Sequence, residues 1–197
     1  MNQQIKNAVR KSNRTVVHLV LMGSLIATGS LSAADENATN ESGHHAGHDY
    51  KVPAKLVETV RNATEQFVDV NAAVAANYHP AFGCVSGPDH GAMGVHYING
   101  VLVGDGLVDA TKPEALIYEP RSDGMHLVGV EFIVDAATWL KSHSAPPTLE
   151  GQAFQFVDSP NRFGIPAFFE LHVWAWRDNP NGAFVDWNNR VSCDGQQ

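Results

Sequence analysis

Positive charge is scarce in this chain of 197 residues, which has 13 Lys and Arg against 21 Asp and Glu. Four of the basic residues fall near the N-terminus, at Lys6, Arg10, Lys11 and Arg14. Without the first 34 residues the chain keeps 9 of its 13 basic residues and all 21 acidic ones, a net charge of −12. Nucleic acids and anionic membrane surfaces attract clustered Lys and Arg. The charge balance therefore argues against both as partners.

Cysteine is rarer still, with only Cys84 and Cys193 in the whole chain. No C-x-x-C pair is present, so the usual thiolate spacing of a zinc or redox motif is missing. We expect the two cysteines to form a disulfide, because such a bond persists in the oxidising compartments that exported proteins enter. The alternative is a reactive or metal-binding thiolate.

Long apolar runs are also lacking, except for the N-terminal stretch 16–31. Basic residues precede it and the small residues Ser32-Ala33-Ala34 follow it, which is typical of a secretory signal. We interpret residues 1–34 as a signal peptide cleaved before Asp35, and expect a periplasmic or secreted protein with no membrane span after cleavage. An uncleaved membrane anchor is the alternative.

The segment after the signal, residues 35–52, has almost no apolar content and is predicted to be a disordered arm. It contains His44, His45 and His48 in the sequence HHAGH, which could bind a transition metal weakly. A solvated polar tail explains these residues as well. The remaining chain length suits one domain, so we expect residues 53–197 to form it.

Apolar residues recur between Pro53 and Tyr78 with the spacing of one helical face. They are Leu56, Val60, Ala63, Phe67, Val70, Val74 and Tyr78. Pro53 suits a first helical turn, and His79-Pro80 should end the helix. The pattern predicts one amphipathic helix of about 25 residues that needs a sheet to pack on.

Short apolar segments after this helix predict a sheet. The expected strands are 93–98, 100–104, 116–118, 127–134, 153–157 and 167–176. The glycine-rich segment 82–94 should be a loop, Asn99-Gly100 a tight hairpin turn, and Asp135 the cap of a short helix over 136–141. The predicted fold class is α+β, with one long N-terminal helix on a curved, mainly antiparallel sheet of five to six strands that forms a cone or an open barrel.

The expected strand 167–176 has one polar and aromatic face. Because side chains alternate along a strand, Glu170, His172, Trp174 and Trp176 should lie together. Such a face is more typical of a ligand pocket than of a solvated sheet. The candidate ligand-binding residues are Trp174, Trp176, Glu170 and Tyr97.

Two other expected strands contain one ionisable residue within an apolar run, His96 in GVHYI and Glu131 in VGVEFIV. Each has a glycine two positions earlier on the same face, Gly94 and Gly129 respectively. Glycine inside a strand often marks the close approach of a ligand or of another backbone. The pattern predicts room for a bound group beside both residues.

His96, Glu131 and His172 together are a candidate metal site, with Glu131 also the candidate catalytic residue. Two histidines and one carboxylate suit Zn²⁺ with an open position, or Fe²⁺ or Mn²⁺. No compact motif such as H-E-x-x-H supports the grouping. The candidates for supporting hydrogen bonds to the ligands are Glu170, His90, Tyr97 and Tyr118.

Three interpretations of this set remain open. A metal centre would activate water or a small substrate. A metal-free pocket would use Glu131 with a histidine as an acid–base pair, or hold a small hydrophobic ligand. A structural network would only let buried polar groups satisfy one another. Separately, Asp178, Asn181 and Asp186 could bind Ca²⁺ in the tail, although turn formation explains them equally well.

Three segments and the closing VSC resemble those of a group of uncharacterised exported bacterial proteins. The segments are GAMGVHY, LVGVEF and LHVWAWRDNPNGAFVDWN. The resemblance covers about the last 120 residues and implies no activity. The chain departs from the cupin pattern, because it lacks paired histidines two residues apart, so no functional residue is carried over from cupins.

Overall fold

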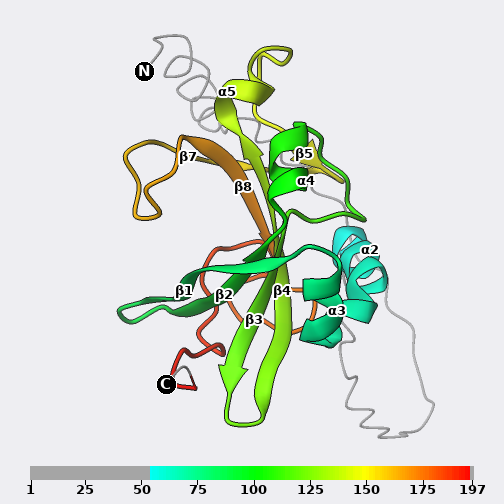
Figure 1. Cartoon of the computed structure of the whole chain (residues 1–197). Helices are drawn as coiled ribbons and strands as arrows, with labels where there is room; N and C mark the ends of the chain where they lie inside the picture. The colour runs from blue at the N-terminus through cyan, green and yellow to red at the C-terminus, as the bar shows by residue number, and fades with distance from the viewer. Residues whose placement is uncertain (1–53, 196–197) are drawn as a thin grey trace, which may run out of the picture.

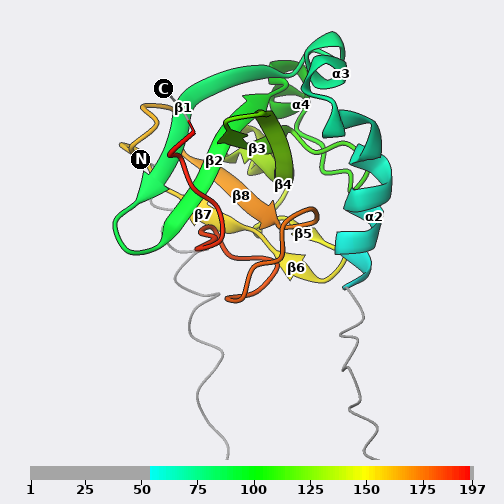
Figure 2. The same ribbon diagram turned by 90° about the horizontal axis from the view of Figure 1, so that it is seen from below.

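The structure, a computed structural model, describes residues 54–195 (Figure 1). The predicted signal peptide (1–34) and histidine-containing arm (35–52) lie outside the described residues. The described part is α+β, and its main sheet is antiparallel, has six strands and curls into a half-barrel (Figures 1 and 2). The predicted class and the curvature of the sheet are confirmed.

The main sheet has the strand order β1-β2-β3-β4-β8-β7. Its strands are β1 (His79–Gly87), β2 (Gly91–Ile98), β3 (Ala115–Arg121), β4 (Gly124–Asp135), β7 (Gln155–Val157) and β8 (Phe168–Val173). A separate ribbon pairs β5 (Thr148–Leu149) with β6 (Gln152–Ala153). The rings of Phe82 on β1 and Phe163 in the β7–β8 connection lie 5.2 Å apart. The curl therefore brings the two ends of the sheet towards each other.

The first helical region is shorter than predicted. Helix α2 (Lys55–Thr64) continues into the 3-10 turn η1 (Glu65–Val68), and a new helix, α3 (Val70–Ala75), follows. Between them Asp69 is extended, with φ −82° and ψ 110°, and its side chain accepts a hydrogen bond from Asn71 N at 2.9 Å. Asp69 is thus the N-cap of α3, so the prediction of one long continuous helix was wrong.

These helices cover one face of the sheet, as Figure 2 shows. Buried residues of α2 pack into the main hydrophobic cluster with residues of β2, β3, β4 and β8. Hydrogen bonds strengthen the contact. Trp176 Nε1 donates to Thr64 Oγ1 at 3.0 Å, and Tyr118 Oη donates to Phe67 O at 2.6 Å. Arg61 Nε of α2 also donates to Ala175 O at 2.8 Å. These helices do not cover the opposite face of the sheet, on the inside of its curvature.

Two short helices follow strands of the main sheet. Helix α4 (Gly100–Asp105) replaces the predicted strand 100–104, because Asn99 Oδ1 accepts from Val101 N at 3.1 Å and caps a helix. Gly106 ends it with φ 71°, in the left-handed region. Helix α5 (Ala136–Trp139) was predicted correctly from its cap, since Asp135 Oδ1 accepts from Thr138 N at 2.7 Å.

Strand β1 and the start of β2 occupy the glycine-rich segment that was predicted to be a loop. Pairing between them shifts register twice, between Ala81 and Cys84 and between Val85 and Ser86. Phe82 and Gly83 both have positive φ, 64° and 65°, within the first irregularity. Bulges of this kind place residues of unusual conformation inside a strand, and they explain why the composition looked like that of a loop.

The C-terminal tail, residues 174–195, lies across the sheet and is attached to it by a disulfide and by hydrogen bonds. A disulfide joins Cys193 to Cys84 on β1, as predicted, across 109 residues. Ala92 on β2 and Asn188 exchange backbone hydrogen bonds of 3.2 Å in both directions. In residues 54–195, no helix has the length and apolar character needed to cross a membrane.

Candidate metal centre

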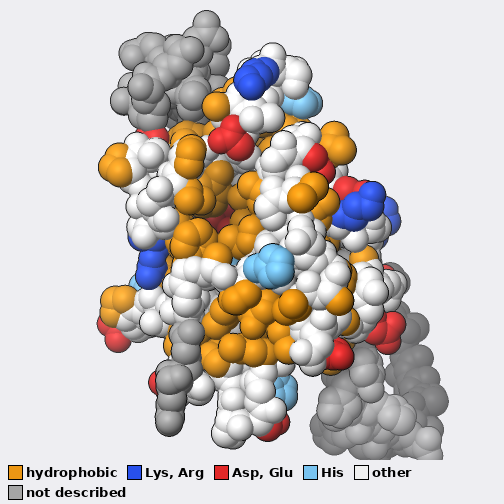
Figure 3. All heavy atoms as spheres, viewed as in Figure 1, with side chains coloured by type: hydrophobic (Ala, Val, Ile, Leu, Met, Phe, Trp, Pro, Cys, Tyr) orange, Lys and Arg blue, Asp and Glu red, His pale blue; other side chains and the backbone are white. Residues whose placement is uncertain are grey.

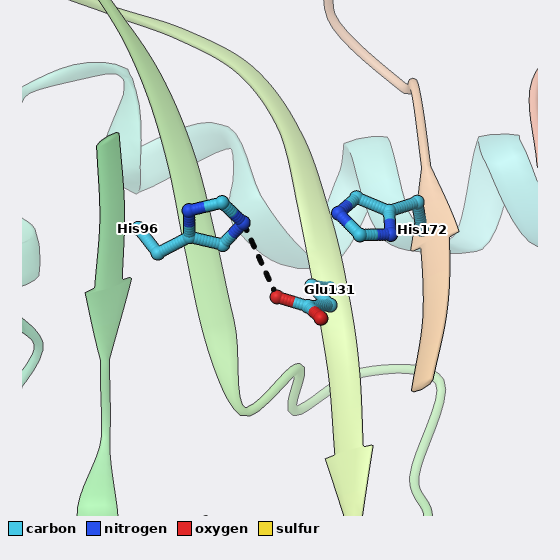
Figure 4. Close-up of side chains that lie close together, drawn as sticks. All are labelled: His96, Glu131 and His172. Carbon is cyan, nitrogen blue, oxygen red and sulfur yellow. Dashed lines mark ion pairs between the residues drawn. The ribbon is translucent and has the colours of Figure 1, made fainter. Parts of the chain in front are cut away.

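Three strands bring His96, Glu131 and His172 together on the sheet face away from the helices (Figure 4). Glu131 on β4 pairs directly with His172 on β8, and His96 reaches the group from β2. One ligand atom from each residue lies within 4.8 Å of those of the other two. His96 Nε2 is 3.3 Å from Glu131 Oε2. Residues far apart in the sequence therefore form a group that could hold a metal ion.

The imidazole nitrogens of this group are buried without partners. His96 is 3% exposed and His172 is 1% exposed. His96 Nδ1 and both ring nitrogens of His172 make no hydrogen bond. Leaving a buried polar group unpaired costs about 1–3 kcal/mol, so most buried polar atoms in proteins are satisfied. Three unpaired nitrogens in one place are therefore unusual.

Burial keeps both histidines neutral. It lowers the pKa of His96 to about 4, against a weaker opposing effect of the Gly94 backbone. It lowers the pKa of His172 to about 3, with a further contribution from neighbouring His96. At pH 7 the contact between His96 and Glu131 is therefore not a salt bridge. Neutral imidazoles keep the lone pairs that metal binding requires.

A second carboxylic acid lies beside Glu131. Glu170 is on β8, two residues before His172, and shares a side-chain hydrogen bond with Glu131. Burial raises the pKa of Glu131 well above its usual value, and the charge of Glu170 raises it further. Burial also raises the pKa of Glu170. Two carboxylic acids that share a hydrogen bond need a proton between them, which Glu131 supplies.

The tail contributes a third acid, Asp186. Its Oδ1 lies 3.7 Å from His172 Nδ1 and accepts a hydrogen bond from Gln155 Nε2 at 2.6 Å. Burial raises the pKa of Asp186. Ligand atoms of Glu170, His172 and Asp186 all lie within 4.8 Å of one another. His172 thus belongs to two groups of potential ligands.

A narrow pocket reaches His96 and Glu131 from between the two ends of the curved sheet. Its lining residues are Phe82, His96, Ile98, Glu131, Ile133, Phe163, Ile165 and Phe168. Its free volume is about 20 Å³, close to what one water molecule needs. A wider groove of about 490 Å³, lined by several of the same apolar residues and by α4, adjoins it. Figure 3 shows a hollow on this face with hydrophobic side chains around it and acidic atoms inside.

Four residues predicted to act at the site lie elsewhere. The rings of Tyr97 and Tyr118, 4.8 Å apart, belong to the core on the helix-covered face. Trp176 packs against the same core, because β8 ends before it and the alternation predicted for 167–176 stops. His90 is exposed in the turn between β1 and β2. These four residues therefore do not lie beside the candidate metal ligands, contrary to the prediction.

Trp174 supports His172 but does not line the pocket. The two rings are stacked at an angle of 22°, with centroids 6.3 Å apart. The indole Nε1 donates to Val185 O at 2.6 Å, which holds Trp174 against the tail. Trp174 is therefore a neighbour of His172, as predicted, but it contacts the imidazole and not the pocket.

Neither predicted glycine leaves space for a ligand. A Cβ on Gly94, which has φ 109°, would lie 2.6 Å from Tyr118 O. A Cβ on Gly129 would lie 2.9 Å from Val173 O. The prediction of room for a bound group was wrong, because adjacent strands approach too closely here for any side chain.

Asp186 was predicted only as a possible Ca²⁺ ligand or turn residue of the tail, and not as a neighbour of His172. Its place could have been found from the turn at Asn179-Pro180-Asn181-Gly182, where Gly182 N donates to Asn179 O at 3.0 Å. The turn folds the tail back, so that Trp174 N donates to Ala183 O at 2.9 Å. A chain that doubles back there returns Asp186 to the level of His172.

The chain matches no protein-family model, no curated protein and no solved structure. What the site can do therefore follows from its own residues. Two neutral imidazoles and a set of buried carboxylates can bind a divalent metal.

Glu114 is a further buried acid that the sequence did not reveal. It is 2% exposed, and its Oε2 accepts from Ile133 N at 3.0 Å. Burial raises its pKa to about 8, although the hydrogen bond from Ile133 opposes this. The residue is thus mostly protonated at neutral pH.

We expect Glu114→Gln to change how stability depends on pH. Because the pKa of Glu114 is higher in the folded than in the unfolded protein, the stability that this residue gives the wild type is greatest below its unfolded-state pKa. The wild type loses that stability as the pH rises to about 8, since the buried carboxyl group must then ionise or the protein must unfold. At pH 9 the free energy of unfolding of the variant should exceed that of the wild type by roughly 2–4 kcal/mol. At pH 5 the two free energies should agree within about 1 kcal/mol. Urea denaturation at both pH values measures this. Equal stability of the two proteins at pH 9 would contradict it.

Proposed function

We propose that this protein binds a divalent transition metal through His96, Glu131 and His172, and that the metal acts on a small molecule outside the cytoplasm. One observation carries the proposal: three buried, unpartnered imidazole nitrogens meet a carboxylate at the end of a pocket. A disulfide in the same fold fits a protein of an oxidising compartment. Zn²⁺, Fe²⁺ and Mn²⁺ suit this donor set.

The size of the pocket favours a metal over a bulky ligand. Pockets for drug-sized ligands measure roughly 300–1,000 Å³, whereas the space beside His96 and Glu131 is about 20 Å³. Only water or the tip of a small molecule fits there. The rest of such a molecule would lie in the adjoining apolar groove, against Phe82, Ile98 and Val103.

Each part of the site has a chemical role in this proposal. The metal would polarise a bound water or substrate oxygen. Glu170 hydrogen-bonds Glu131 and so orients it towards the metal. Apolar side chains around the pocket exclude bulk water, which strengthens electrostatic interactions inside.

A second candidate function needs no metal. The hydrogen bond between Glu131 and Glu170 places a proton at the end of an apolar pocket, where it could be transferred to or from a small substrate. This alternative leaves the unpaired nitrogens of His172 unexplained, so we rank it below the metal centre.

Metal analysis of the full chain, purified without a histidine tag, tests the proposal. The arm histidines His44, His45 and His48 are replaced by glutamine in every protein, so that the arm cannot contribute metal. We expect at least one Zn²⁺ or Fe²⁺ per chain after loading and desalting, measured by inductively coupled plasma mass spectrometry. In this background His96→Ala should weaken binding at the site at least tenfold.

The matched control is His126→Ala, which removes a histidine of β4 that pairs with Asp123 away from the site. It should bind metal like the parent. Absence of metal from the parent protein would overturn the proposal and favour the acid–base alternative. So would equal metal affinity in the parent and in His96→Ala.

A further inference from the structure

His172 belongs to two groups of potential ligand atoms. One group includes His96 and Glu131, and the other includes Glu170 and Asp186. Glu170 also shares a hydrogen bond with Glu131, so the two groups adjoin. Its Nδ1 is 3.7 Å from Asp186 Oδ1, and Figure 4 shows its other ring nitrogen directed towards the side of His96. Neither nitrogen has a hydrogen-bond partner. A single metal bound by His96, Glu131 and His172 would use one of these nitrogens and leave the other unpaired.

The carboxylates are more numerous than one metal requires. Glu131, Glu170 and Asp186 crowd around His172, yet within residues 54–195 no Lys or Arg forms an ion pair with any of them. Buried carboxylates need a partner of opposite charge or a proton. Metal binding would displace the proton that Glu131 shares with Glu170, so that all three acids are charged. One divalent ion would then balance two of the three charges. A second divalent ion would balance the third charge and the negative charge that the His172 ring acquires when its N–H proton leaves.

We propose that a second divalent metal binds to Glu170, Asp186 and His172 Nδ1, so that His172 bridges two metal ions. This inference rests on the proposed function, because the first ion is the one held by His96, Glu131 and the other nitrogen of His172. The imidazole gives up its N–H proton to solvent when the second ion binds, so that each ring nitrogen donates one lone pair. Gln155 Nε2 holds the Asp186 carboxylate in place from the side, at 2.6 Å.

The two positions differ in donor type. The first position has two imidazole nitrogens and one carboxylate, which suits Zn²⁺. The second has two carboxylates and one nitrogen, which shifts preference towards harder ions such as Mn²⁺. A two-metal centre can also hold an oxygen anion between its ions. The substrate class that fits is a small molecule with an oxygen anion at one end and an apolar part for the groove.

The number of ions per chain tests the inference. The full chain with His44, His45 and His48 replaced by glutamine is titrated with Zn²⁺, and separately with Mn²⁺, by isothermal titration calorimetry. We expect two ions per chain. Asp186→Asn should bind one, and Glu170→Gln, a second variant in case the first fails to fold, should also bind one. The matched control is Asp178→Asn, an exposed acid of the same tail that pairs with Arg190, and it should bind two.

The outcomes separate the two proposals. One ion in the parent protein overturns the second position and leaves the proposed function standing. One ion in the parent whose affinity merely falls in Asp186→Asn also overturns it, because Asp186 would then only orient His172. No ion in the parent overturns the proposed function itself. Cu²⁺ loading adds an independent measurement, since two bridged Cu²⁺ ions should couple and give less electron paramagnetic resonance signal than two isolated ions.

Discussion

Replacing His172 by leucine should make the metal-free protein more stable while abolishing its stabilisation by Zn²⁺. His172 is 1% exposed and both its ring nitrogens lack a partner, and an unsatisfied buried polar group costs about 1–3 kcal/mol. Leucine removes that cost and is apolar, so the free energy of unfolding should rise by a similar amount. In the wild type, Zn²⁺ at 1,000 times its Kd should add about 4.1 kcal/mol. Chemical denaturation with and without Zn²⁺ measures both effects.

The opposite result would identify a structural network. Removing one partner of a buried, satisfied hydrogen bond leaves the other partner unpaired and typically costs about 1–3 kcal/mol. A His172→Leu variant that lost this much stability without metal, and a wild type that gained nothing from Zn²⁺, would show that the polar group serves only folding. His126→Leu is the control, because that histidine is partly exposed and should leave both measurements unchanged.

Removing the disulfide should cost the protein a large part of its stability. Cys84 and Cys193 are separated by 109 residues. On the chain-entropy model a disulfide that closes a loop of that size stabilises the folded protein by about 4.7 kcal/mol, and the stabilisation found in practice is typically about 2–4 kcal/mol. The double variant Cys84→Ser, Cys193→Ser should therefore unfold roughly 10 °C lower in a calorimetric scan.

Reductant provides the control for this prediction. Dithiothreitol should lower the melting temperature of the wild type to that of the double variant, and should not affect the variant. A wild type whose melting temperature is unchanged after complete reduction, checked by thiol titration, would contradict the expectation. The variant should also bind the proposed second ion less tightly, because the tail between β8 and Cys193 loses its covalent link to β1.

Strand periodicity predicted the sheet better than helical periodicity predicted the helices. Alternation placed β2, β4 and β8 close to their true positions, since their buried residues leave little freedom of register. The helical pattern continued through Asp69, where the chain starts a second helix, because apolar spacing does not report on a capping side chain. At Asn99 the same kind of cap was mistaken for a hairpin turn.

The candidate metal ligands were predictable because each is an ionisable residue within an otherwise mostly apolar strand. Alternation directed His96, Glu131 and His172 to one face, and the curl of the sheet brought them together. The same reasoning failed for Trp176, which lies beyond the end of β8. It could not place Asp186, whose position depends on a turn, a backbone pairing and a disulfide distant from the strand pattern.

An open half-barrel has two free borders, β1 and β7, and each could recruit a strand from another molecule. Strand β1 contains Pro80, which has no N–H to donate, and the irregularity at Phe82 and Gly83. Strand β7 spans only Gln155–Val157. Neither edge strand therefore offers a regular row of hydrogen-bonding groups to a strand of another molecule. The irregularities of β1 thus also protect the protein from edge-to-edge aggregation.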